Sequence, residues 1–169
     1  ERFPAEVLGN ALDGWEGERW LDIRSPAVRE IMIARLDLAA KKRCDAVHPD
    51  NIDGYTNDTG FPLTAADQLA FNKFLAEAAH ERSMAIGLKN DLDQIPELLE
   101  SYDFAINEEC FLYNECQKLT PFIEAGKAVF QIEYGRQSRA TEICPLANAL
   151  DFDTLVKDIR LGAYRISCR

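Results

Sequence analysis

The chain has 169 residues, of which 47% are hydrophobic and 9% aromatic, enough for one domain with a hydrophobic core. Its 19 Lys and Arg residues stand against 29 Asp and Glu residues, which gives a formal net charge of −10. No stretch supplies the basic clustering of a phosphate-binding surface, and no apolar run approaches the roughly 18 residues of a membrane span. The composition therefore predicts no membrane span and no nucleic-acid partner.

Strand-like runs alternate with amphipathic helical runs, a pattern typical of βα units around a parallel sheet. The first predicted strand is residues 19–23, and Ser25 and Pro26 then favour the start of a helix. This helix has one apolar stripe, which consists of Val28, Ile31, Met32, Leu36 and Ala39. The second predicted strand, residues 44–48, leads into the polar, turn-rich stretch 49–62.

Thr64 is the predicted N-cap of the next helix. Its expected buried face consists of Leu69, Ala70, Phe74, Leu75 and Ala78. Four further strands are predicted at residues 84–88, 103–106, 128–132 and 154–156. Between them we expect a short helix at 95–101 and a helix through Phe122 that ends at Gly126, a residue type suited to the left-handed position after a helix. The sequence therefore predicts an α/β fold.

Each predicted strand ends in a cluster of charged or amide side chains. The clusters lie at residues 22–24, 50–53, 89–91, 107–109, 133–134 and 157–158. In a βα array the carboxyl ends of the strands meet on one face, so we expect one polar active site there. The alternative is that charged residues end strands only because loops are solvated.

The length limits the architecture. A complete (β/α)₈ barrel needs roughly 250 residues, whereas this chain has room for about six βα units. It therefore corresponds either to an open doubly wound sheet or to most of a barrel whose first two strands precede residue 1. The chain begins Glu-Arg-Phe-Pro, without Met or a signal-peptide core, which indicates a processed or fragmentary start.

Five cysteines are many for a cytosolic chain of this size, and they form no Cys-x-x-Cys pair. We therefore expect disulfides and a secreted, extracellular protein. No nucleophile elbow, dinucleotide-binding loop or phosphate-binding loop occurs, so no cofactor is expected. A metal site is not indicated either, because the stretch around Asp53 does not match a calcium loop and the chain has only two His residues.

Carboxylates remain as agents of catalysis. Glycoside hydrolysis needs two of them, one to protonate the leaving oxygen and one to meet the positively charged sugar carbon. Asp50 and Glu108 follow different predicted strands, and each has an Asn beside it. Different surroundings of the two carboxyls would separate their pKa values and hence their roles.

Four segments together make the assignment more specific: 45–55 (DAVHPDNIDGY), 87–91 (GLKND), 107–110 (NEEC) and 126–134 (GKAVFQIEY). In wording, order and spacing they resemble glycoside hydrolase family 114, the endo-α-1,4-polygalactosaminidases. The resemblance runs from about Trp20 to the C-terminus. It implies that residues 1–169 form a single domain of the (β/α)₈ TIM-barrel type that lacks its first two strands.

The resemblance also implies a function, the retaining cleavage of α-1,4-linked galactosamine polymers such as galactosaminogalactan. Asp50 matches the family's nucleophile and Glu108 its acid/base, with carboxyls expected ~5–5.5 Å apart. Other positions that match the family's cleft are expected to bind substrate or to position the pair. They are Asp22, Asn51, Lys89, Asn90, Glu133 and Tyr134, with Asp53 and Tyr55 as weaker candidates.

The implied substrate is polycationic, so a protein of charge −10 would attract it, and binding should weaken with salt. Three departures from the family point to a divergent member. His48 stands where an acidic residue is usual, and Arg43 and Ser83 stand where a Gly usually ends the preceding helix. The alternatives to an active glycosidase are a degenerate, non-catalytic sugar-binding relative and an unrelated open-sheet domain that binds a small molecule.

Two disulfides are expected. A bond between Cys110 and Cys116 would close a five-residue loop directly after Glu108 and hold it in place. Cys144 and Cys168 form the second expected pair, which leaves Cys44 for a partner upstream of this sequence.

Overall fold

The computed structural model describes residues 3–169 and consists of two compact units, Glu1–Ile86 and Gly87–Arg169. The boundary lies inside strand β4 (Ala85–Lys89), after its second residue. Both units contain parallel strands accompanied by helices, so the predicted α/β class is confirmed. Among the described residues the strands form no closed barrel.

The first unit begins with a short antiparallel hairpin. After a 3₁₀ turn, η1 (Ala5–Val7), strand β1 (Leu8–Ala11) pairs with β2 (Arg19–Leu21). The prediction that residues 19–23 form the first strand of the parallel array was therefore wrong. Gly14 and Gly17 have φ values of 76° and 88°, and these left-handed residues reverse the chain so that β2 pairs locally instead.

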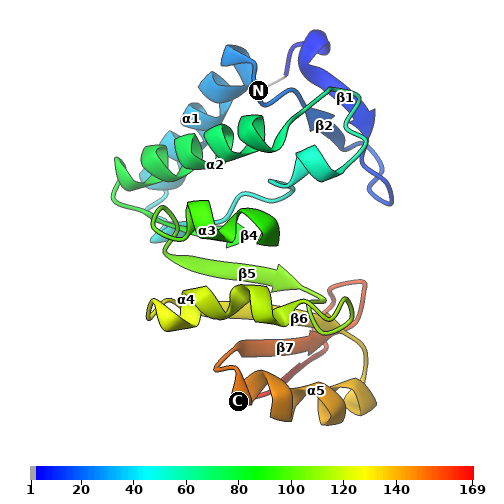
Figure 1. Cartoon of the computed structure of the whole chain (residues 1–169). Coiled ribbons are helices and arrows are strands. Elements are labelled where there is room, and N and C mark those ends of the chain that lie inside the picture. Colours follow the sequence, from blue (N-terminus) through cyan, green and yellow to red (C-terminus); the bar gives the residue numbers. More distant parts are fainter. Residues whose placement is uncertain (1–2) are drawn as a thin grey trace. The chain divides into compact units, whose positions relative to one another are not determined.

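Two long helices follow the hairpin, α1 (Pro26–Lys41) and α2 (Ala65–His80), and they pack side by side (Figure 1). Helix α1 starts where predicted, although the Ser25 side chain makes no capping hydrogen bond. Helix α2 has the predicted cap: Thr64 accepts from the Asp67 amide, and the Asp67 carboxylate accepts from the Thr64 amide. Such a capping box satisfies two amides that would otherwise lack a partner.

The buried face of α2 differs from the predicted one. Leu75 and Ala78 are buried as expected, whereas Ala70 is exposed. Two polar side chains, Gln68 and Asn72, are buried in its place. An apolar-periodicity rule misses them because their burial depends on hydrogen bonds rather than on hydrophobicity.

Strand β3 (Ala46–Val47) is shorter than predicted and pairs in parallel with Ala85 and Ile86 of β4. The helix-to-strand turns before β3 and β4 contain Arg43 and Ser83, with φ values of 62° and 58°. Both residues thus occupy the left-handed position that Gly occupies at low cost. A second 3₁₀ turn, η2 (Gly54–Thr56), lies in the long loop between β3 and α2.

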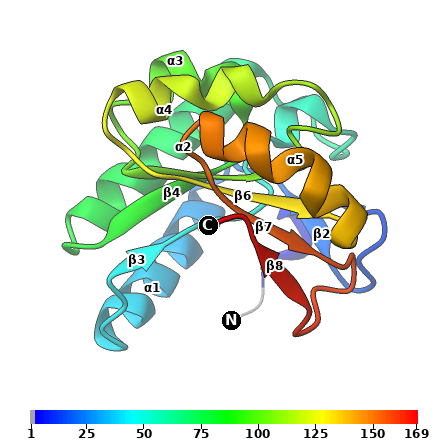
Figure 2. The ribbon, with the colours of Figure 1, turned by 90° about the horizontal axis from the view of Figure 1, so that it is seen from below.

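In the second unit, the end of β4 pairs in parallel with β5 (Phe104–Glu108), followed by β6 (Val129–Tyr134) and β7 (Asp153–Lys157). A final strand, β8 (Arg165–Ser167), is antiparallel to β7. The helical elements are η3 (Leu92–Gln94), α3 (Ile95–Leu98), η4 (Cys116–Leu119), α4 (Thr120–Glu124) and α5 (Gln137–Ala149). Figure 2 shows α4 and α5 on the same side of β6 and β7.

Gly126 follows α4 with φ of 72°, as predicted for a residue that ends a helix. Helix α5 and strand β8 were not predicted. Helix α5 contains Pro145, a residue that argues against a helix interior, yet its buried Ala140 and Ile143 pack against Val156 of β7. Within residues 3–169, no helix is both long enough and apolar enough to cross a membrane.

Candidate active site

Asp50 and Asn51 follow β3 and line a cavity of about 580 Å³ in the first unit, together with Trp20 and Gln68. Asp50 is exposed, and its Oδ1 accepts a hydrogen bond of 2.9 Å from the Asn51 amide. Asn51 has φ of 53°, a left-handed conformation that Asn tolerates better than most residues. This local bond orients the Asp50 carboxylate at the end of its strand.

Two buried, hydrogen-bonded side chains of α2 hold the segment that follows Asp50. Gln68 Nε2 donates to Asn72 Oδ1 at 2.8 Å, and Asn72 Nδ2 donates to the Ile52 carbonyl at 3.0 Å. Gln68 and Asn72 are 1% and 0% exposed. Sequence reasoning missed both residues, and the only available signal was two amides one helical turn apart on a face otherwise lined by apolar residues.

Three other predicted residues of the first unit have structural partners. The Asp22 carboxylate accepts from the Arg24 side chain at 2.8 and 3.0 Å, and this bond lowers the pKa of Asp22. Asp53 is the N-cap residue of η2, and its carbonyl accepts from the Thr56 amide at 3.0 Å. Tyr55 lies half-buried in the same turn.

In the second unit, Glu108 is the last residue of β5 and Lys89 the last residue of β4. Lys89 is 7% exposed, and its Nζ lies 3.4 Å from Oε1 of the half-buried Glu108. The structure thus brings these two predicted residues together. Lys89 can orient this carboxyl, which stays partly accessible at the strand end and can therefore contact a bound molecule.

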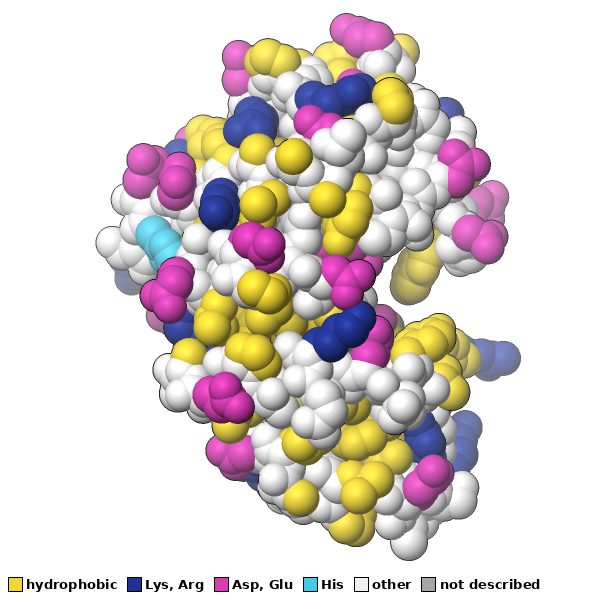
Figure 3. All heavy atoms as spheres, viewed as in Figure 1, with side chains coloured by type: hydrophobic (Ala, Val, Ile, Leu, Met, Phe, Trp, Pro, Cys, Tyr) yellow, Lys and Arg dark blue, Asp and Glu magenta, His cyan; other side chains and the backbone are white. Residues whose placement is uncertain are grey.

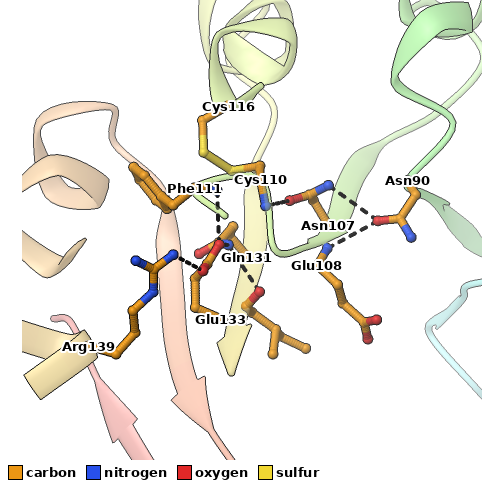
Figure 4. Close-up of a disulfide and its surroundings, with 10 residues drawn as sticks. Asn90, Asn107, Glu108, Cys110, Phe111, Cys116, Gln131, Glu133 and Arg139 are labelled. Atoms are coloured by element: carbon orange, nitrogen blue, oxygen red, sulfur yellow. Dashed lines mark hydrogen bonds and ion pairs between the residues drawn. A yellow bond between two sulfur atoms is a disulfide. The ribbon is translucent and has the colours of Figure 1, made fainter. Parts of the chain in front are cut away.

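Asn90 fixes the backbone of the same strand end (Figure 4). Its Oδ1 accepts from the Glu108 amide at 3.0 Å and from Asn107 Nδ2 at 3.2 Å. Asn107, which is 1% exposed, in turn accepts from the Cys110 amide at 3.1 Å. The structure therefore links Asn90 to Glu108 through the main chain.

Glu133, near the end of β6, is 1% exposed and has three partners. Its Oε1 accepts from the Phe111 amide at 2.9 Å and from Gln131 Nε2 at 2.8 Å, and its Oε2 accepts from Arg139 at 2.7 Å (Figure 4). The bond to Glu133 raises the pKa of Arg139. Sequence reasoning did not single out Arg139, which belongs to the unpredicted helix α5.

Glu109, between Glu108 and the disulfide, has φ of 63°. Burial raises the pKa of its carboxyl, and the negative charges of Glu133 and Glu108 raise it further. Tyr134, the last residue of β6, is half-buried and pairs in register with Lys157 of β7.

Both expected disulfides are present, Cys110–Cys116 and Cys144–Cys168, and Cys44 is an exposed free thiol. The first bond closes the loop directly after Glu108 and Glu109. Within residues 3–169, no group of three or more His, Cys, Asp or Glu side chains is placed to hold a metal ion.

The chain is similar to known proteins in sequence and in fold. The family model described as "Glycoside-hydrolase family GH114" matches residues 1–169. The crystal structure of Aspergillus fumigatus Ega3 in complex with galactosamine is 44% identical, with a TM-score of 0.93, over 98% of this chain and 70% of that one.

Two structures of the glycoside hydrolase domain of PelA from Pseudomonas aeruginosa share the fold. The variant E218A has a TM-score of 0.68 and the other structure 0.64, each at 14% identity over 96% of this chain and 72% of that one. No curated protein matches the chain. The match over the full sequence and the likeness to Ega3 show that this chain belongs to glycoside-hydrolase family GH114 and is a glycoside hydrolase.

Proposed function

We propose that the protein is a retaining endo-glycosidase that cleaves α-1,4-linked galactosamine polymers, of the galactosaminogalactan type. Membership in GH114 supports the hydrolysis of a glycosidic bond. The 44% identity to Ega3, whose crystal structure is a complex with galactosamine, supports the choice of sugar. The observation that carries the proposal is Glu108, an accessible carboxyl with a fixed backbone and a facing lysine.

In this proposal Asp50 is the nucleophile and Glu108 the acid/base. An Asp50 oxygen bonds to the anomeric carbon while Glu108 protonates the departing glycosidic oxygen, which leaves a covalent glycosyl-enzyme. Glu108 then takes a proton from water, whose oxygen displaces Asp50 from the anomeric carbon. Two displacements restore the original anomeric configuration. Asp50 follows the carboxyl end of one parallel strand and Glu108 is the last residue of another, and barrel enzymes carry their catalytic groups at these strand ends.

The remaining predicted residues divide by their surroundings. Asn51 lines the same cavity as Asp50 and is proposed to contact the sugar, with Asp53 and Tyr55 beside it. Lys89 is proposed to orient the Glu108 carboxyl and Asn90 its main chain. Asp22, Glu133 and Tyr134 stay candidates for positioning or substrate contact.

The net charge of −10 favours a cationic polymer as the partner. On the face shown in Figure 3, Asp and Glu side chains are scattered among hydrophobic and uncharged ones. On this face the attraction would therefore come from the summed charge more than from one acidic patch. The two disulfides support a proposed location outside the cell, where such bonds persist.

The test measures new reducing ends in galactosamine polymer. Asp50→Asn and Glu108→Gln are each expected to abolish their release while circular dichroism stays unchanged. Glu97→Gln, an exposed carboxylate on α3, is the matched control and should retain wild-type activity. Hydrolysis that persists in either active-site variant would reject the pair. Salt-sensitive binding of the polymer to the wild type without any cleavage would instead indicate a degenerate, sugar-binding relative.

A further inference from the structure

We propose that Arg139, acting through the buried carboxylate of Glu133, positions the loop that runs from Glu108 to the Cys110–Cys116 disulfide. The residues concerned are 108–111, called here the acid/base segment, and they lead directly into the Cys110–Cys116 bond. The inference rests on the proposed function, because the position of this segment affects catalysis only if Glu108 is the acid/base.

Four consecutive amides of the acid/base segment have partners. The amides of residues 108 and 110 donate to the side chains of Asn90 and Asn107, at 3.0 and 3.1 Å. The amide of residue 109 donates to the Ile132 carbonyl at 2.8 Å, and that of residue 111 to Glu133 at 2.9 Å. Glu133 is therefore the only charged acceptor among these four, and charge-assisted hydrogen bonds are the stronger kind.

The charge of Glu133 depends on Arg139. A carboxylate that is 1% exposed loses its hydration and needs a fixed counter-charge. Arg139 supplies it at 2.7 Å from Oε2, while Oε1 remains for the Phe111 amide and Gln131. Figure 4 shows both the guanidinium of Arg139 and the backbone amide of Phe111 joined to this carboxylate by dashed lines. Arg139 thereby keeps Oε1 a charged acceptor for the segment.

Gly135 allows Arg139 to reach this position. A Cβ atom at residue 135 would lie 2.6 Å from Cβ of Arg139, closer than carbon atoms approach, and 3.0 Å from its Cγ, a very tight contact. Any side chain there must displace Arg139. The close approach at Gly135 therefore couples the position of Arg139, in the first turn of α5, to Glu133 and through it to the acid/base segment.

The surroundings distinguish this role from substrate binding. Both carboxylate oxygens of Glu133 accept hydrogen bonds from the protein, and its burial leaves almost no surface for a sugar. Arg139 has a second, exposed partner, Glu142, at 3.2 Å. Glu142 contacts the same guanidinium without contacting the acid/base segment, which makes Glu142→Gln the matched control.

The experiment compares Glu133→Gln, Gly135→Ala, Arg139→Met, Arg139→Lys and Glu142→Gln with the wild type. Hydrogen exchange at the Phe111 amide, measured by NMR, reports the hydrogen bond from this amide to Glu133. The values of kcat and KM are measured separately on galactosamine polymer. Glu133→Gln and Gly135→Ala are expected to speed exchange at Phe111 and to lower kcat about 10- to 100-fold with little change in KM. Arg139→Lys should retain more activity than Arg139→Met, and Glu142→Gln should match the wild type.

Each other result overturns the inference. A raised KM with unchanged kcat would show that Glu133 or Arg139 binds substrate, and faster exchange with unchanged kcat would show a purely structural role. If Arg139→Met does not fold, Gly135→Ala still displaces the guanidinium with both charges retained. If the wild type cleaves no polymer, the proposed function fails on its own. Unchanged hydrogen exchange at the Phe111 amide in Glu133→Gln would refute the positioning role of Glu133 whatever the activity.

Discussion

Oδ1 of Asn90 accepts a hydrogen bond from the main-chain amide of Glu108 at 3.0 Å, so the proposed acid/base is held through its backbone by the residue directly after the neighbouring strand β4. The same oxygen accepts Nδ2 of the buried Asn107 at 3.2 Å. One side-chain oxygen therefore satisfies two donors at the end of β5. The carboxyl of Glu108 stays free of this network and is available for chemistry.

Removal of that oxygen should be costly. Asn90→Ala leaves a buried amide of Asn107 and the Glu108 N–H without an acceptor, which we expect to destabilise the protein by about 1–3 kcal/mol. Asn90→Asp keeps an acceptor oxygen and should lose much less. Urea denaturation of the two variants provides the comparison. Equal loss in both would contradict the importance of the acceptor.

The left-handed residues before β3 and β4 predict stabilising substitutions. Ser83 and Arg43 have φ values of 58° and 62°, where a Cβ atom is strained and Gly is not. Ser83→Gly and Arg43→Gly should each raise the free energy of unfolding by about 1 kcal/mol after the entropy cost of Gly. Glu81→Gly, at an ordinary helical φ of −55°, is the control and should lower it. A loss of stability in Ser83→Gly would refute the strain.

Glu109 should make stability fall as the pH rises. Its pKa is raised above the ordinary 4.5, so the folded state keeps its proton where the unfolded state has lost it. Glu109→Gln should therefore be more stable than the wild type near about pH 8, and the gain should vanish below the ordinary pKa, near about pH 3.5.

Asp22 should make stability rise with pH, the opposite of the effect of Glu109. Its pKa is lowered by Arg24, so the stability it contributes is present above its ordinary pKa of 3.8 and is lost as the pH falls through the folded value. Asp22→Asn should thus be less stable than the wild type at neutral pH and equal to it in acid. Chemical denaturation at about pH 8 and about pH 3.5 checks Glu109, and the same measurement at neutral pH and at a pH well below 3.8 checks Asp22. A pH-independent effect at Glu109 would contradict the burial of its carboxyl.

Removal of the two disulfides should affect stability and activity to different extents. The sequence separations are 6 for Cys110–Cys116 and 24 for Cys144–Cys168, so loop entropy predicts that their removal costs about 2 and about 3.5 kcal/mol. Only the first bond adjoins the proposed acid/base. The double Ser variant of the first pair should lose more activity and less stability than that of the second. The reverse order in polymer cleavage would contradict a role of this loop in positioning Glu108.

Local chemistry allowed part of the fold to be predicted. The capping box at Thr64, the helix end at Gly126 and both disulfides depend on residues close in sequence or on simple pairing. The hairpin of β1 and β2 could not be predicted from the strand signal in 19–23, because that signal does not identify the partner strand, which the left-handed turn at Gly14 and Gly17 determines. Helix α5 was missed because Pro145 masks a helix that buries Ile143 against β7.

The positions of the candidate residues at strand ends could be predicted from the sequence, whereas their contact partners could be predicted less well. The position of Glu108 at a strand end follows from the sequence pattern, and the structure adds Lys89 and Asn90 beside it. The contact between Glu133 and Arg139 gave no sequence signal, because it joins a strand to a helix across the close approach at Gly135. Such contacts depend on packing, which periodicity and motifs do not encode.

The most direct test of the proposed function traps the covalent intermediate. The protein is incubated with 5-fluoro-α-galactosaminyl fluoride. An Asp50 oxygen should bond to the anomeric carbon of this sugar and displace fluoride, and the ring fluorine should slow hydrolysis of the resulting glycosyl-enzyme. Mass spectrometry of digested protein should then find the sugar on the peptide that contains Asp50, and Asp50→Asn should carry none. A sugar attached to another residue, or turnover that gives the inverted anomer without any adduct, would contradict the account.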